Sequence, residues 1–159
     1  MDQYPTQDDA IRYSADFFTA VEAYRTGDTD TVVDVLAGPE TDDQTHMRHL
    51  YAMFSVAAML AGRAARKACA DPDDPAPMDG PAMLEIGDVR TGLRAHPEDL
   101  DPDERVTLWA LAAGANVDVD GVAAHLRTIG RRGGPKAVCD GILTFVKIMA
   151  AAWDGESLS

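Results

Sequence analysis

Cysteine is scarce in this sequence, and its two cysteines, Cys69 and Cys139, lie far apart in the chain. Neither belongs to a Cys-x-x-Cys pair or has a histidine at ligand spacing, whereas a structural zinc site uses four such ligands. Two isolated cysteines are typical of buried thiols rather than of a disulfide framework. We therefore expect no structural metal site and no cofactor.

Long apolar runs are also missing. The first residues, Met1 to Asp9, are polar and acidic, so no signal peptide is predicted. The longest near-continuous apolar run extends from Leu50 to Ala61 and is interrupted only by Ser55. A membrane-spanning helix needs about 20 apolar residues. The sequence thus predicts a cytoplasmic protein without a membrane segment.

Catalytic motifs are absent as well. The chain has no GxSxG, GxGxxG or HExxH pattern, and no phosphate-binding loop of the Walker type. No residue can be nominated as a nucleophile or a general base. The sequence therefore favours a protein that is not an enzyme.

Positive charge is limited, and the acidic excess is segregated along the chain. The formal net charge is −13, with aspartate supplying 21 of 27 acids and arginine 11 of 14 bases. Residues 1–45 and 71–104 each carry a net charge of −9, whereas residues 46–70 carry +4. Such a surface repels nucleic-acid phosphates, so nucleic acid is not an expected partner. The Asp, Arg and Ala bias is typical of a GC-rich bacterial genome, with a halophilic source as the alternative.

Helical periodicity runs through nearly the whole chain. Hydrophobic residues make up 46%, which is enough for a core, and the pattern predicts one all-α domain over 1–159. We expect a compact bundle of five to seven helices with at most one short strand. The first two helices are predicted at about 7–26 and 29–37. Thr6 and Asp28 are their expected caps, and Gly27 ends the first helix.

The first predicted helix carries two neighbouring apolar lines, which together predict a broad stripe packed into the core. One line holds Ile11, Ala15 and Phe18 with Glu22, and the other holds Ala10, Tyr13, Phe17, Val21 and Tyr24.

A long helix at about 42–70 is the predicted centre of the fold, and Thr41 with Gln44 resembles its capping box. Its middle is apolar on every side, which is typical of a helix that is either central or shared with another subunit. The last predicted helix also has an apolar face. We therefore predict a homodimer with the interface candidates Leu50, Phe54, Ala58, Phe145, Met149 and Trp153.

A proline-rich segment divides the chain into two helical halves. Residues 71–81 contain four prolines, which exclude a helix and predict an exposed acidic loop. Residues 83–86 are a candidate strand and 89–96 a candidate short helix. Further helices are expected at about 101–113, from Asp118 or Asp120 to about 129, and at 135–153, with a frayed tail at 155–159.

The basic, glycine-rich segment 130–136 is the most distinctive candidate site. It places Arg131, Arg132 and Lys136 around a predicted helix N-terminus, where Gly134 leaves backbone N–H groups accessible. Such groups bind phosphate or carboxylate ions. The alternative is a flexible connection whose cations pair with the acidic segments. A DNA-reading helix-turn-helix is disfavoured because the last helix has little polar surface.

Two other patterns imitate metal sites. His46 and His49 share one helix face, as metal ligands do, but the sequence identifies no third ligand, and two solvated imidazoles are the preferred interpretation. Residues 116–121 imitate the start of a calcium loop, but Arg127 stands where a bidentate glutamate belongs. Helix capping explains that segment better.

Three hypotheses about function follow. The leading one is a binding or regulatory protein that acts through helix–helix contacts, with a second copy of itself or with a protein partner. The second is a protein that binds a small anionic ligand at residues 130–136. The third is an acidic decoy that imitates DNA, which the two strongly acidic segments indicate.

Overall fold

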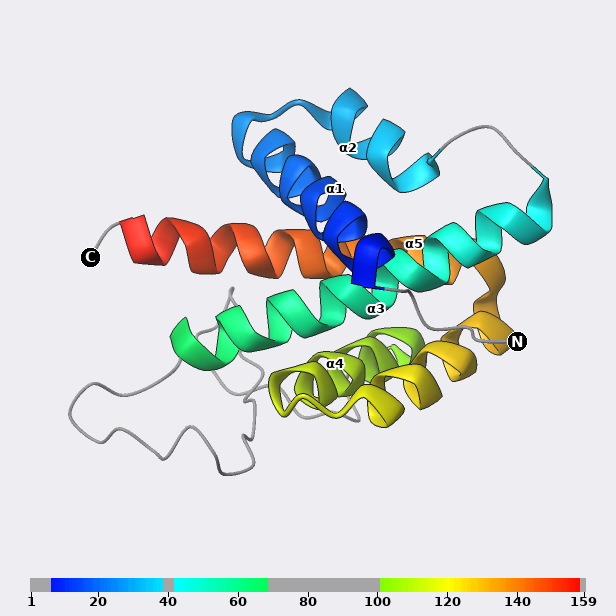
Figure 1. The fold of residues 1–159 in the computed structure, drawn as a ribbon. Helices are drawn as coiled ribbons and strands as arrows, with labels where there is room; N and C mark the ends of the chain where they lie inside the picture. Colours follow the sequence, from blue (N-terminus) through cyan, green and yellow to red (C-terminus); the bar gives the residue numbers. More distant parts are fainter. Residues whose placement is uncertain (1–6, 39–41, 69–100, 158–159) are drawn as a thin grey trace.

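A computed structural model describes residues 7–38, 42–68 and 101–157, and these ranges hold five helices and no strand (Figure 1). The helices are α1 (Gln7–Thr26), α2 (Thr29–Ala37), α3 (Asp43–Ala68), α4 (Pro102–Ala115) and α5 (Val119–Ser157). The predicted all-α class is confirmed, and α3 is the expected long helix. The segments 71–81, 83–86 and 89–96 lie outside the described residues. None of the helices in the described ranges has the length and apolar character needed to cross a bilayer.

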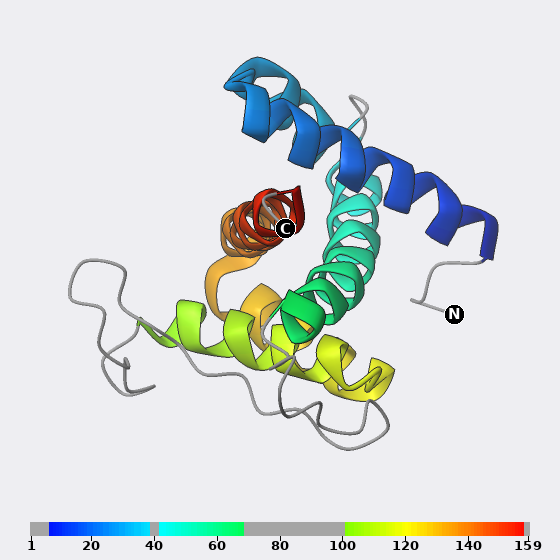
Figure 2. The same cartoon turned by 90° about the vertical axis from the view of Figure 1, so that its left-hand side faces the viewer.

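Helices α3, α4 and α5 pack against one another, and a hairpin of α1 and α2 covers one side of them. Helix α1 contacts both α3 and α5, whereas α2 contacts mainly α1. Figures 1 and 2 show the α1–α2 hairpin on one side of α3 and α4 on the other. The hairpin therefore has one side on the core and another that faces away from it.

Aspartate caps start three of the described helices. Asp28, Asp42 and Asp118 each accept a hydrogen bond from the backbone N–H three residues further on, at 3.2, 2.9 and 3.0 Å respectively. These bonds satisfy N–H groups that a helix start leaves without a partner. Asp42 therefore takes the capping role that the sequence pattern gave to Thr41, and Asp118 rather than Asp120 begins α5.

Helices α1 and α4 end in the same backbone motif with different residues. In both, an N–H group past the helix end donates to the carbonyl five residues earlier, at 2.8 Å. This motif needs a left-handed residue just before that N–H, normally glycine. Helix α1 uses Gly27 at a φ of 81°, but α4 uses Val117 at a φ of 56°. The calcium-like segment 116–121 is thus a helix end followed by a helix cap.

Aromatic rings from α3 and α5 meet in the core, to which α1 adds a third buried ring. Phe54 of α3 and Phe145 of α5 pack edge to face with ring centroids 4.9 Å apart, and Phe17 of α1 is fully buried as well. The other large side chains with almost no exposure include Leu50, Met53, Ile129, Ile142, Val21, Val122, Val138 and Val146. The apolar middle of α3 is therefore used inside a single chain.

Glycines bring the backbones of α3 and α4 into contact. A Cβ atom on Gly62 of α3 would lie 2.6 Å from the carbonyl oxygen of Leu111, and one on Gly114 of α4 would overlap the carbonyl group of Ala58. Real Cβ atoms do not approach so closely, so each helix presents a bare backbone to the other at this crossing.

Helix α5 is kinked where the sequence predicted a loop between two helices. Residues 130–133 continue the helix, and only Gly134 leaves helical geometry, with φ 68° and ψ −159° just before Pro135. Ile129 and Val138, on either side of the kink, are both buried. Packing thus holds both halves in place and confines the break to one glycine. The helix then extends to Ser157, so the first residues of the predicted frayed tail are helical.

Candidate functional site

Most of the residues predicted as a dimer interface lie inside one chain. Five of them are buried by the other helices of the same chain, namely Leu50, Phe54, Ala58, Phe145 and Met149, and the side chain of Trp153 lies outside the described residues. The hairpin of α1 and α2 and helix α4 cover α3 from two sides, so a second chain reaches these side chains only by displacing a helix. Of the two roles that an all-round apolar helix can have, α3 takes the central one.

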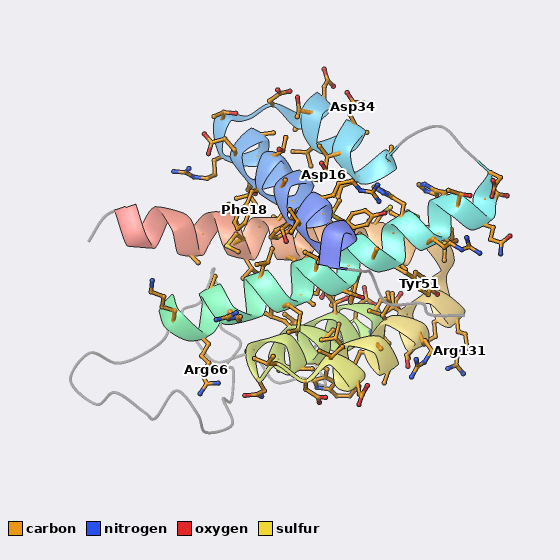
Figure 3. All side chains as sticks on the ribbon, viewed as in Figure 1. Asp16, Phe18, Asp34, Tyr51, Arg66 and Arg131 are labelled. Carbon is orange, nitrogen blue, oxygen red and sulfur yellow. The ribbon has the colours of Figure 1, made fainter. Side chains whose placement is uncertain are left out.

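The basic segment 130–136 lies at the kink of α5, and Arg131 points away from the bundle (Figure 3). Arg131 and Arg132 are exposed, and neither has an ion-pair partner within the described part of the chain. Lys136 instead pairs with Asp140 at 3.5 Å. A carboxylate oxygen of Asp103 lies 3.5 Å from where a Cβ on Gly133 would be. These two carboxylates weaken the attraction of the kink for an anion.

The side chain of His49, on α3, contacts both α1 and α2. Its Nε2 atom lies 3.3 Å from the carbonyl oxygen of Val35 in α2, and its ring centroid lies 5.4 Å from that of Tyr13 in α1. Burial lowers the pKa of His49, which favours the neutral imidazole. Over the ranges that the structure covers, no group of three or more potential ligands is close enough to hold a metal, so nothing there completes a site with His46.

Cys139 is a free, half-buried thiol on α5. Burial raises its pKa, and the nearby Asp140 carboxylate adds to the effect. The thiol is therefore protonated at neutral pH and a poor nucleophile. Cys69 lies outside the described residues.

Helix α1 exposes apolar side chains on the side that faces away from the core. Ile11 is 63% exposed and Phe18 is 38% exposed, with the exposed Ala15 between them. Tyr13 and Phe17, on the opposite side, are buried. The sequence predicted that both apolar lines of this helix pack into the core, and for the Ile11 line this is wrong. Helix α1 is apolar on two sides, and the described part of the chain covers only one.

Helix α2 carries two exposed carboxylates on its outer side. Asp30 and Asp34 are one turn apart, exposed, and on the side of α2 opposite the buried Val32 and Leu36. Neither carboxylate has an ion-pair partner among the residues described. Figure 3 places Phe18 and Asp34 on the two helices of the hairpin. We define the hairpin face as the exposed apolar line of α1 formed by Ile11, Ala15 and Phe18.

Other large apolar side chains are exposed near the junction of α4 and α5. Trp109 lies with its ring centroid 5.9 Å from that of His125, and Val117 and Val119 flank the helix cap. Burial lowers the pKa of His125. Scattered exposed apolar residues are common on protein surfaces, and this group lacks the regular spacing of the α1 line.

Within the described residues, the fold is an all-α helical bundle whose helix α1 exposes an apolar line. No protein-family model, no curated protein and no solved structure matches the chain. The hypothesis of a DNA-imitating decoy depends on the acidic segments 1–45 and 71–104, of which residues 1–6, 39–41 and 71–100 lie outside the described residues. The chemistry of the hairpin face is therefore the basis for a functional proposal.

Proposed function

We propose that this chain is a binding protein that acts through helix–helix contacts, and that its hairpin face receives another helix. The exposure of Ile11 and Phe18 opposite the buried side of α1 is the observation that carries this proposal. Ile11 and Phe18 are seven residues apart in the helix, which corresponds to about 10 Å along its axis. A docking helix uses anchors at this spacing when its apolar face meets an apolar groove or line.

The physical gain from docking is the removal of apolar surface from water, worth about 25 cal/mol per Å². Ala15 adds to this gain by its size, because a small residue between two large ones lets a second helix approach closely.

The test uses three designed helical peptides with one leucine pattern and with lysine, glutamine or glutamate on the polar face. Each is titrated into isotope-labelled protein, and backbone amide shifts are followed. We expect at least one peptide to shift resonances of α1 and α2. The double variant Ile11→Ser with Phe18→Ser should lose this binding.

The matched control changes two exposed apolar residues elsewhere, Trp109→Ser with Val119→Ser, and should bind as the native chain does. Light scattering tests the homodimer, the other occupant that the sequence predicted. If no peptide shifts α1 and α2 and the chain stays monomeric at high micromolar concentration, the proposal is contradicted.

Binding of an anionic ligand at the kink of α5 is a second candidate function. It is supported by the exposed Arg131 and Arg132, which have no ion-pair partner in the described part of the chain. Calorimetry with inorganic phosphate tests it. Heat that disappears in the double variant Arg131→Ala with Arg132→Ala supports an anion site, and no heat in the native chain contradicts it.

A further inference from the structure

We infer that the neutral imidazole of His49 holds the α1–α2 hairpin on the bundle, and that proton uptake by this side chain opens the hairpin as a unit. His49 contacts the inward side of α1, opposite the exposed apolar line, so this contact is separate from the docking role proposed above. It gives a regulatory role to a histidine whose spacing from His46 imitates a metal site.

His49 lies where the hairpin meets α3. Its Nε2 atom lies 3.3 Å from the carbonyl oxygen of Val35 on α2, and its ring centroid lies 5.4 Å from that of Tyr13 on α1. The ring also packs against the backbone of Gly38, where a Cβ atom would lie 2.6 Å from Nε2. One side chain thus contacts both helices of the hairpin and the residue that ends α2.

The two helices of the hairpin pack together as one unit. Helix α1 contacts α2 about as extensively as it contacts α3, whereas α2 contacts α3 at few residues. The contacts of His49 are therefore a large share of what connects α2 to α3. Local opening of a protein usually involves such a packed pair of elements, so a weaker contact at His49 loosens α1 and α2 together.

A positive charge on His49 is unfavourable while the hairpin is closed. The side chain is half-buried, and burial is the main reason why the pKa of His49 lies below its ordinary value of 6.5. The Arg12 guanidinium lies 4.7 Å from the centre of the Tyr13 ring. An imidazolium would therefore lie beside an aromatic ring that already holds a cation.

Groups on all three helices act on the imidazole. His46 on α3 and Arg12 on α1 lower its pKa in addition to burial. The Val35 carbonyl on α2 and the Asp16 carboxylate on α1 raise it, but the net direction is downward. The charged ring keeps an N–H group for the Val35 carbonyl, so protonation leaves that bond intact. The cost of the charge is its transfer out of water.

Proton uptake therefore favours the open hairpin. In the open form His49 is in water, where its pKa is about 6.5. Below this pH the open form takes up the proton, and the closed form does so only at lower pH, so opening becomes more favourable as the pH falls. Opening also exposes Tyr13 and Phe17, an apolar surface that the closed chain withdraws from water.

Amide hydrogen exchange measures the opening of each helix. Protection factors, which correct for the intrinsic pH dependence of exchange, are compared at about pH 7.5 and about pH 5.5. We expect the protection of α1 and α2 to fall about threefold or more at the lower pH, because each unit of difference in pKa changes an opening equilibrium by up to about tenfold.

Three variants assign this fall to His49. His49→Gln keeps a side-chain N–H group for the Val35 carbonyl but does not titrate, so the fall at α1 and α2 should disappear. The matched control His125→Gln removes the histidine on α5 whose pKa burial also lowers, and it should keep the fall. Asp16→Asn leaves His49 in place and removes an attractive carboxylate, so the fall should be larger.

Three results would overturn the inference. The first is protection of α1 and α2 in the native chain that does not change between the two pH values. The second is a fall that persists in His49→Gln. The third is an equal fall at α1, α2 and α4 in His125→Gln, which would mean that the whole chain unfolds instead of the hairpin alone.

Discussion

Val117 holds a backbone conformation that glycine provides at the equivalent position after α1. Its φ of 56° lies in the left-handed region, where a β-branched side chain is strained, and its side chain is exposed, so packing does not compensate. The hydrogen bonds that close the end of α4 hold it there.

Replacing Val117 with glycine should raise the free energy of unfolding by up to about 1 kcal/mol. The left-handed conformation costs a non-glycine residue about 1–2 kcal/mol, and the greater freedom of glycine in the unfolded chain offsets about 0.5–1 kcal/mol of that gain. Urea unfolding followed by circular dichroism measures the difference. The control Val119→Gly, at the first position of α5, should lower stability, and the same sign for both variants would refute this account.

At the scale of elements, the attachment of the α1–α2 hairpin to α3 depends partly on His49. Its imidazole contacts the carbonyl of Val35 and the ring of Tyr13, so protonation would place a charge between packed helices. Burial lowers the pKa of His49 below its ordinary value of 6.5. The hydrogen bond to the Val35 carbonyl and the Asp16 carboxylate oppose this shift, whereas His46 and Arg12 act in the same direction as burial.

The free energy of unfolding should therefore fall as the pH decreases below 6.5. The unfolded chain takes up a proton at His49 near this pH, and the folded chain does so only at lower pH. Denaturant unfolding at about pH 7.5 and about pH 5.5 measures the change. His49→Gln should make the dependence shallower, and His125, whose pKa burial also lowers, leaves a residual slope of the same sign. An unchanged slope in His49→Gln would exclude this role.

The crossing of α3 and α4 makes a second prediction about elements. In Gly114→Ala, the added methyl group would meet the backbone carbonyl of Ala58, which cannot rotate away as a side chain can. We expect the free energy of unfolding to fall by about 1–3 kcal/mol, as is typical of overpacking. The control Ala124→Ser, at an exposed position of α5, should change the free energy of unfolding by no more than about 0.5 kcal/mol. Equal stability of the two variants would show that the helices separate easily.

At the scale of the whole molecule, the net charge of −13 opposes the compact state through repulsion between carboxylates. Adding sodium chloride should therefore raise the melting temperature, because the Debye length falls to about 3 Å at about 1 M salt. Differential scanning calorimetry in increasing sodium chloride measures this effect. A melting temperature that decreases with salt would mean that attractive ion pairs dominate the charge balance.

The sequence predicted helix positions well where local chemistry sets them. Gly27 and Asp28 mark the end of α1 and the start of α2, because backbone conformation and capping depend on neighbouring residues. The capping residue of α3 is Asp42 instead of the predicted Thr41, because both side chains carry an oxygen that can accept the hydrogen bond. At Gly134, the predicted break between two helices is present as a kink, but residues 130–133, expected in the connection, continue the first helix.

The candidate site was not predictable in the same way. In the sequence, the site is indicated by an apolar stripe on α1 that is wider than one buried side of a helix requires. One line of this stripe ends at Glu22. That width indicates a surplus of apolar surface but not which line stays exposed. Five of the expected interface residues are buried within the chain itself, because an all-round apolar helix fits the centre of a fold as well as a shared interface.

The sequence by itself determined the helical class, the junction of α1 and α2 at Gly27 and Asp28, and the acidic balance, because these follow from spacing, local chemistry and composition. Only the tertiary structure decided that α3 lies at the centre, that Tyr13 and Phe17 rather than Ile11 and Phe18 face inward, and that the break before Pro135 is confined to Gly134. The physical reason is that burial is a property of helices packed together. Each helix presents several apolar sides, and the neighbours it meets determine which of them is withdrawn from water.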